Sequence, residues 1–283
     1  MSRPTSTKPA RAGTGTGIPR DCLYRLSEGV LRQMRAWPLD RDALRLLHVL
    51  LYRTCRACPD WRGRSDPQPE AGYREAFRDV HGWQGTRPDR GNGAILAAMA
   101  RLRGTGAFAR LEALDGNRAL RWWLADEAFA MLLADDTFGY LDVGILPHLR
   151  DAMALRLLGE IALVRGMRRP ELRLDVEDLH RAGGLEGPLA WKTVRRPLLA
   201  ALRTIGAHHR LRLVVGLACH HRLAGIDTLD IRIEHAGTVW STAALGRFGH
   251  RVREVVVIDG AGEHRLRRDQ LPAYLGSRVR MPA

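Results

Sequence analysis

The sequence predicts an α+β protein of two tandem winged-helix domains, mostly helical with small antiparallel hairpins. Three observations support this fold class. Successive segments carry apolar residues at helical spacing, glycines follow the ends of several of these segments, and paired strand-like runs close each series. Three helices followed by a hairpin occur over residues 40–124 and again over residues 140–235. The copies share order and spacing more than residue identity, so the duplication is an inference from pattern.

The first series begins with DRDALRLLHVLLYRTC, whose leucines have the spacing of a buried helix face. The segment YREAFRDVHGW predicts a short helix ended by Gly82, and NGAILAAMARLRGTGAF predicts a third helix ended by Gly104 and Gly106. The run FARLEALDGNRALRWWLA then splits into two strand-like pieces around Asp115-Gly116-Asn117, which is a strong hairpin signal. These elements predict the first winged-helix domain.

The second series opens with a strand and turn in YLDVGILPHL and a long helix in DAMALRLLGEIALVRG. ELRLDV predicts an edge strand, and DVEDLHRAGGL a short helix capped by Asp175 and stopped by Gly183 and Gly184. KTVRRPLLAALRTI is the third helix. The alternating runs RLRLVVGLA and TLDIRIEH predict a hairpin, joined by the basic loop CHHRLAG.

We therefore divide the chain into four parts. Residues 1–20 predict a flexible basic arm, 21–135 the first winged-helix domain, 136–235 the second, and 236–283 a C-terminal extension. The extension contains a hairpin signal in REVVVIDGAGEHRLRR and a short helix or loop around DQLPAYLG. Its role stays open, and packing on the second domain or continuing its sheet are the two expectations.

Arginine dominates the charge of the chain. Lys and Arg together number 45 against 31 acidic residues, a net charge of +14, and Lys8 and Lys192 are the only lysines. GC-rich coding accounts for the scarcity of lysine but for little of the net charge. Because guanidinium groups bind phosphates and guanine edges, the excess indicates an anionic polymer as partner. The apolar runs are too short for a membrane span, and the four scattered cysteines indicate a reducing cytosol.

The third helix of the second series combines an apolar face with a basic one. Val194, Leu198 and Leu202 would hold it on the core. We predict that its basic face and the following hairpin contact double-stranded DNA, with helix residues at base edges or flanking phosphates and hairpin arginines at phosphates. The predicted contacts are Lys192, Arg195, Arg196, Arg203, Arg210, Arg212 and Arg222. The alternative, a merely solvated basic face, is weakened because helix and hairpin are basic together.

Pro197 lies inside this helix. A proline removes one helical hydrogen bond and crowds the preceding turn. We expect it either to start the regular part of the helix or to bend it, which would place Lys192, Arg195 and Arg196 on a separate N-terminal segment.

The first series offers fewer basic residues in its third helix. The helix centre, AILAAMA, has no charge, and small alanines suit packing against another protein as well as they suit a DNA groove. This unit is equally suited to dimerisation, to contact with the DNA backbone, or to both. Its predicted DNA contacts are Arg90, Arg101, Arg110 and Arg118.

Metal and catalytic signals are weak. Cys55-x-x-Cys58 with His48 upstream is half of a zinc pattern, but small, partly buried cysteines at a helix end explain it better. His209 and Arg212 match the H-x-x-R of tyrosine recombinases, with Trp240 and Tyr274 as further candidates, yet the spacing fits poorly. We expect no cofactor, no metal and no catalysis.

The second series resembles the second winged helix of plasmid replication initiators of the iteron-binding kind. The resemblance covers about 95 residues. In that family a hydrophobic strand leads into a helix with an Ala-Leu-Arg-Leu core, and the recognition helix carries an Arg-Arg pair and a proline. The matching positions here are Ala154-Leu155-Arg156-Leu157, Gly184-Leu185, Arg195-Arg196, Pro197 and Ile205. The turn after the recognition helix and the long C-terminal extension depart from the family pattern.

This resemblance implies a protein that binds repeated sites at a plasmid origin, helps to open an AT-rich segment and recruits host replication machinery. As a homodimer it would also repress its own promoter. Two alternatives remain: a winged-helix transcriptional regulator without an origin role, and a DNA strand-transfer enzyme. Charge and spacing alone support the narrower hypothesis of sequence-specific duplex binding.

Overall fold

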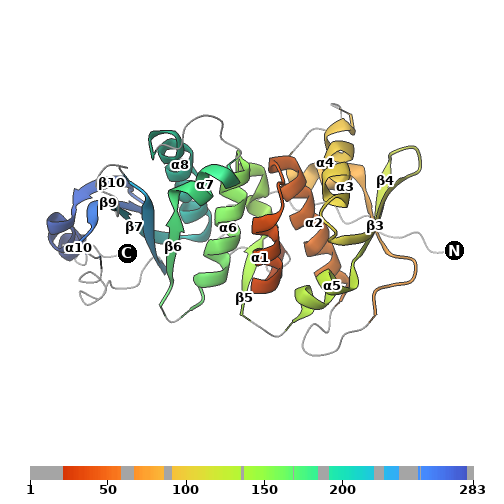
Figure 1. The fold of residues 1–283 in the computed structure, drawn as a ribbon, viewed down its shortest axis with the longest axis horizontal. Coiled ribbons are helices and arrows are strands. Elements are labelled where there is room, and N and C mark those ends of the chain that lie inside the picture. The colour runs from red at the N-terminus through yellow and green to blue at the C-terminus, as the bar shows by residue number, and fades with distance from the viewer. Residues whose placement is uncertain are drawn as a thin grey trace.

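The computed structural model describes residues 22–58, 67–85, 91–134, 137–167, 169–183, 191–219, 226–235, 248 and 250–278. The predicted arm, residues 1–20, lies outside the described residues. Helices and antiparallel strands alternate along the chain, so the fold class is α+β, as predicted. Figure 1 shows a three-stranded sheet at one end of the molecule, a five-stranded sheet at the other, and a layer of helices between them.

The first unit consists of α2 (Arg41–Ala57), β2 (Tyr73–Ala76), α3 (Phe77–Gln84), α4 (Gly93–Arg103), β3 (Phe108–Leu114) and β4 (Ala119–Leu124). Its strands form a sheet of order β2-β4-β3, so the first strand pairs with the third. The predicted hairpin is confirmed, and its turn holds Asp115, Gly116 and Asn117 at positive φ angles of 54°, 63° and 66°.

The second unit repeats this order. It consists of α6 (Ala152–Val164), β6 (Glu171–Asp175), α7 (Val176–Ala182), α8 (Trp191–His209), β7 (Leu211–Ala218) and β8 (Thr228–His235). The strand order β6-β8-β7 again pairs the first strand with the third. The predicted repetition of elements is therefore present, and β6 is an edge strand as expected.

The predicted short helix over 73–83 was wrong at both ends. Its first residues form β2, in which Tyr73 lies opposite Trp122 and their rings stack at 5.6 Å between centroids. The helix α3 ends at Gln84, where Gly85 adopts the left-handed conformation, so Gly82 does not end it. The first residues of this segment form a strand because they pair with β4, and this pairing outweighs their local helical spacing.

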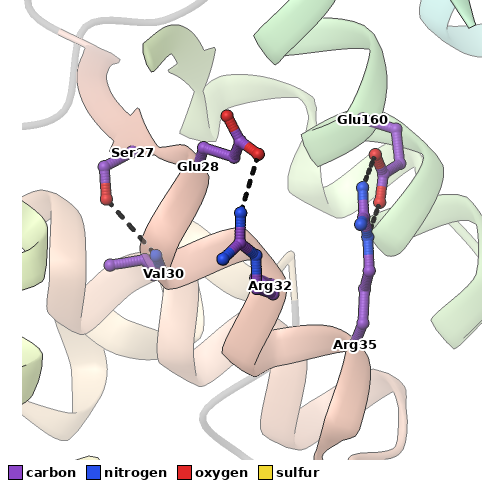
Figure 2. Close-up of polar contacts among 6 residues, drawn as sticks. All are labelled: Ser27, Glu28, Val30, Arg32, Arg35 and Glu160. Atoms are coloured by element: carbon purple, nitrogen blue, oxygen red, sulfur yellow. Dashed lines mark hydrogen bonds and ion pairs between the residues drawn. The ribbon is translucent and has the colours of Figure 1, made fainter. Parts of the chain in front are cut away.

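Three further elements were not predicted: β1 (Leu23–Ser27), α1 (Glu28–Ala36) and α5 (Asp126–Leu133). β1 pairs antiparallel with β5 (Phe138–Asp142), which precedes a 3-10 helix, η3 (Val143–His148), so the N-terminal segment joins the start of the second unit. Ser27 caps α1, because its Oγ accepts from Val30 N at 3.3 Å (Figure 2). The same Oγ donates to Met131 O of α5 at 2.6 Å. α1 thereby links α5 to the second unit.

One hydrophobic core runs through both units. It extends from Tyr24 in β1 to Ile258 near the C-terminal end without a break between the units. Arg35 of α1 forms a bidentate ion pair with Glu160 of α6, with both nitrogen–oxygen distances at 2.6 Å (Figure 2). Arg156 of α6 donates to the carbonyl oxygen of Trp37 at 2.6 Å. The two units therefore pack as one body, and the predicted domain boundaries stay predictions.

The C-terminal extension continues the sheet of the second unit, one of the two expectations for it. β9 (Val252–Asp259) pairs with β7, and β10 (Gly262–Arg267) pairs with β9, giving the order β10-β9-β7-β8-β6. A second 3-10 helix, η4 (Arg268–Gln270), leads into α10 (Leu271–Arg278), which packs on the face of the sheet away from α8. The predicted hairpin of the extension is confirmed, and the segment expected to be a short helix or loop is a helix.

Candidate nucleic-acid interface

The helix α8 presents its predicted apolar face to the core. Val194, Leu198, Leu202 and Ile205 are completely buried, and α8 contacts α6 on one side and strands β7 and β9 on the other. The helix is continuous from Trp191 to His209 with Pro197 inside it. The expectation of a separate N-terminal segment was therefore wrong, because packing along the whole apolar face outweighs the one hydrogen bond that proline removes.

The opposite face of α8 is exposed and basic. Lys192, Arg196, Arg203 and then Arg210, just past the helix end, follow one another at spacings of four, seven and seven residues, which place them along one side. Ala200 and Ala207 lie between them, so the middle of this side has small side chains. A small-residue surface with cations along it permits close approach of an anionic polymer. We call Lys192, Arg196, Ala200, Arg203, Ala207 and Arg210 the exposed stripe.

Ion pairs distinguish the predicted DNA contacts from one another. Arg195 Nη2 lies 3.4 Å from Glu254 Oε1 on β9, and Arg203 Nη1 lies 3.5 Å from Glu263 Oε2 on β10. Arg212 stands opposite Glu234 across the β7–β8 ladder. Burial raises the pKa of Glu234, and the charge of Arg212 opposes that rise.

Among the described residues, the other three predicted cations of this unit have no acidic partner: Lys192, Arg196 and Arg210. Arg210 has a positive φ of 53°, and its left-handed backbone turns the chain from α8 into β7. Arg222 belongs to residues 220–225, which lie outside the described residues.

A groove of about 900 Å³ lies along the flank of α8 that faces the start of α6. Thr204 and His208 line it from α8, and His148 and Arg150 line it from the segment between η3 and α6. Both His148 and Arg150 are exposed. Arg150 was not predicted as a contact, because it follows η3 in the sequence and only the fold brings it beside α8. It adds an unpaired cation to this flank within the described part of the chain.

The first unit has a weaker arrangement. Arg101 of α4 forms an ion pair with Asp40, the N-cap of α2, and Arg110 of β3 pairs with Glu112 at 2.8 Å. Arg118, at the β3–β4 turn, is exposed and has no acidic partner among the described residues. Arg90 lies in residues 86–90, outside the described residues. Its third helix thus exposes alanines, as the sequence predicted, and the one predicted contact on that helix, Arg101, is already paired with an acid.

Asp142, His208 and His209 are a group of described residues whose ligand atoms lie within 4.8 Å of one another. His208 Nε2 lies 2.7 Å from Asp142 Oδ2, and Arg165 Nη1 donates to His209 Nδ1 at 2.9 Å. Burial, with the nearby charge of Arg165, lowers the pKa of His209 to about 3. A guanidinium against the ring disfavours a metal cation there. The group is best explained as a hydrogen-bond network that ties α8 to β5.

The cysteines near the end of α2 are partly buried, as the sequence indicated. Cys58 Sγ lies 3.6 Å from the hydroxyl oxygen of Tyr73, and Cys55 Sγ lies 3.9 Å from the carbonyl oxygen of Arg25. His48 is buried on another turn, with Nδ1 at 2.5 Å from the Tyr24 hydroxyl. These side chains make separate contacts, and no ligand group that includes them occurs among the described residues.

The H-x-x-R residues also lie on different elements. His209 is buried at the end of α8 against Arg165, whereas Arg212 lies on β7 opposite Glu234. Tyr274 lies on α10, beside His264 at 5.2 Å between ring centroids. Trp240 lies outside the described residues. The described residues of this set therefore do not converge on one place.

Comparisons with known proteins give one informative result. No family model matches the sequence, and no curated protein is significantly similar to it. Among solved structures, the fold is similar to the crystal structure of a Pi initiator protein in complex with iteron DNA, with a TM-score of 0.50 and 11% sequence identity. The match covers 78% of this chain and all of the other. At this identity the likeness shows the fold. No described helix is long and apolar enough to cross a membrane.

Proposed function

We propose that this protein is a plasmid replication initiator that binds repeated double-stranded DNA sites through two tandem winged helices. The observation that carries the proposal is the exposed stripe on α8, the third helix of a helix–strand–helix–helix–strand–strand unit. In winged-helix proteins this helix enters the major groove and the hairpin contacts the adjacent backbone. The fold is similar to that of an initiator bound to iteron DNA, which supports the same use of the fold here.

Lys192 and Arg196 are the best candidates for base contacts. Both are exposed near the start of α8 and have no acidic partner within the described residues. Arginine can donate two hydrogen bonds to the O6 and N7 atoms of guanine, and Ala200 and Ala207 would let the helix backbone lie close to the groove floor. Arg150 and Arg210 would bind phosphates on either side and so orient the helix.

Arg195 and Arg203 play a different part in this proposal. Each already has a carboxylate from the extension within 3.5 Å. A base contact by Arg195 would require it to leave Glu254. We therefore assign to Arg195 the positioning of β9 against α8, and to Arg203 a shared contact with phosphate.

The rigid arrangement of the two units fits binding to repeated sites. α4 and α8 both reach the upper side of the molecule in Figure 1, and the ion pair between Arg35 and Glu160 fixes the helices between them. Two DNA-contacting helices that are held at a constant separation require contact points at a constant spacing on the duplex. α4, with its alanine surface, would contribute backbone contacts or a dimer interface.

In the proposed role the protein also opens an AT-rich segment and recruits host replication proteins, and as a homodimer it represses its own promoter. This role requires no catalysis and no cofactor. The main alternative is a winged-helix regulator with no origin role, which would use the same interface. A strand-transfer enzyme is the weaker alternative because its two described candidates have other partners: His209 lies against Arg165, and Arg212 stands opposite Glu234.

The test begins with selection of bound duplexes from a random library by the full chain. We expect one preferred sequence, and we expect it as direct repeats beside an AT-rich stretch near the gene. Gene and repeats together should then maintain a replicon that lacks its own origin. The Arg196→Ala variant should fail in this assay, and Arg32→Ala, an exposed change on α1, should succeed. Repression without maintenance would favour the regulator, and no sequence preference would contradict both.

A further inference from the structure

The C-terminal extension places a second row of cations beside α8. The register of β9 and β10 fixes which side chains these are. On β9, Val256 and Ile258 belong to the main core together with the apolar face of α8, whereas Val255 and Val257 pack with α10 on the other face of the sheet. The residues of β10 that lie opposite Val256 and Ile258 therefore share the α8 face.

Three charged residues of β10 are on this face. Glu263 stands opposite Ile258, Arg265 opposite Val256, and Arg267 opposite Glu254. β10 is the outermost strand of the sheet among the described residues, and both arginines are exposed. Neighbouring strands are about 4.8 Å apart, which puts β10 one strand beyond the edge of the surface that α8 covers.

The two carboxylates on this face hold the guanidinium groups in place. Glu263 Oε1 accepts from Arg265 at 3.1 Å, and Glu263 Oε2 lies 3.5 Å from Arg203 of α8, so one carboxylate bridges the helix and the strand. Glu254 lies 3.4 Å from Arg195. Three arginines, 195, 203 and 265, thus share two acids. Arg267 forms no ion pair among the described residues, so the surface remains positive.

The opposite flank of α8 is the groove lined by His148 and Arg150. Asp151 also lines this groove, and so do four residues of the exposed stripe: Arg196, Ala200, Arg203 and Ala207. The stripe therefore has cations on both flanks, Arg150 from the segment before α6 and the β10 arginines on the other side. Phosphates border the major groove on both sides, and the groove is about 12 Å wide. A helix inside the groove with cations on both flanks matches this charge pattern.

We propose that the α8-facing side of β10 is a second binding site for the duplex backbone, in which Arg265 and Arg267 contact phosphates along one edge of the groove that α8 enters. This inference rests on the proposed DNA binding by α8. The extension that departs from the family pattern thereby widens the interface on one side.

The test compares the full-length Arg265→Ala/Arg267→Ala variant with the wild-type chain in salt titrations, using the selected duplex and a scrambled duplex. We expect weaker binding to both duplexes to a similar degree, and a slope of log affinity against log salt that is shallower by about 2, since two phosphate contacts are lost. Arg265→Lys/Arg267→Lys should keep the wild-type slope because each lysine retains its charge. Arg32→Ala is the control for loss of a surface charge.

A hydroxyl-radical footprint gives a readout that does not depend on affinity. The alanine variant, at saturating concentration, should lose protection of the backbone on one side of the site only. Unchanged slope and footprint, together with weakened binding by Lys192→Ala/Arg196→Ala, would overturn the role of β10 and leave the proposed function standing. A wild-type chain that binds no duplex would overturn both.

Discussion

Arg35 of α1 and Glu160 of α6 face each other in a bidentate ion pair, and they join the N-terminal part of the chain to the first helix of the second unit. The Glu160 side chain is 9% exposed and that of Arg35 is 55% exposed, so the carboxylate depends on this guanidinium for its charge partner. Figure 2 shows a second pair on the same helix, Arg32 with Glu28, at 3.1 Å. The carboxylate of that pair is far more exposed, at 42%, and its arginine somewhat more, at 74%. The two pairs are therefore matched in chemistry and differ in burial.

Arg35→Ala should lower the free energy of unfolding by about 1–3 kcal/mol, because it leaves a buried carboxylate without its donors. Arg32→Ala should change it by less than about 1 kcal/mol, as is usual for exposed pairs. Denaturant unfolding measures both. Adding Glu160→Gln to Arg35→Ala should recover part of the loss, since the unpaired charge is removed. Equal effects of the two alanine variants would contradict the linking role of Arg35.

Gly139→Ala should destabilise the chain strongly. A Cβ at this position of β5 would lie 2.0 Å from the carbonyl oxygen of Ala162 in α6, and a backbone atom cannot move aside cheaply. We expect a loss of roughly 1–3 kcal/mol or more from this overlap. Gly82→Ala in α3 is the matched control, because no atom lies within 4 Å of its Cβ position. Alanine there should be neutral or stabilising by about 0.5–1 kcal/mol. Thermal unfolding of the two variants would show whether β5 packs this closely on α6.

Stability should fall as the solution becomes acidic below pH 6.5. Burial, with the charge of Arg156, lowers the pKa of His48 to about 3. Its ordinary value of 6.5 applies to the unfolded chain, so only the unfolded state takes up a proton between these values. The contribution of His48 to the free energy of unfolding is complete above pH 6.5. It is lost as the pH falls toward 3, by about 1.4 kcal/mol per pH unit. The lowered pKa of His209 makes stability depend on pH in the same direction.

His48→Gln isolates this effect. The variant should be less destabilised at pH 5 than at pH 7, by about 2 kcal/mol, because it lacks the group whose protonation favours the unfolded wild-type chain. Denaturant titrations at the two pH values give the difference. An equal destabilisation at both would mean that His48 is accessible to protons in the folded state.

Cys55 should react slowly with alkylating reagents. Burial, with the neighbouring Cys58, raises the pKa of the Cys55 thiol to about 12. The thiolate is the reactive form, so at pH 8 the folded chain should be modified at Cys55 far more slowly than the denatured chain. Peptide mass spectrometry after timed labelling measures this. Equal rates in the two states would place Cys55 at the surface and reopen the metal-site interpretation.

Local patterns predicted the elements whose signal lies in neighbouring residues. The apolar residues of α6 and of the buried face of α8 recur at helical spacing, and Asp115-Gly116-Asn117 is a turn sequence. β2 was missed for the opposite reason. It is a strand because it pairs with β4, about 45 residues further along the chain, and its own four residues give no clear alternation.

The basic character of α8 was readable from sequence, but the partners of its arginines were not. Arg195 and Glu254 are 59 residues apart, and only the addition of β9 to the sheet brings them together. Arg265 and Arg267 alternate along β10, and this alternation predicts a shared face. Which face that is depends on the register with β9, which the sequence alone does not specify.

The affinity of the full chain for its selected duplex tests the central claim most directly when wild type, Lys192→Ala/Arg196→Ala and Arg32→Ala are measured side by side. The double variant should lose at least about 1–3 kcal/mol of binding free energy on the selected duplex and less on a scrambled one, so that sequence preference falls. Arg32→Ala should bind like wild type. If the double variant kept the wild-type affinity and preference, α8 would not be the helix that reads DNA.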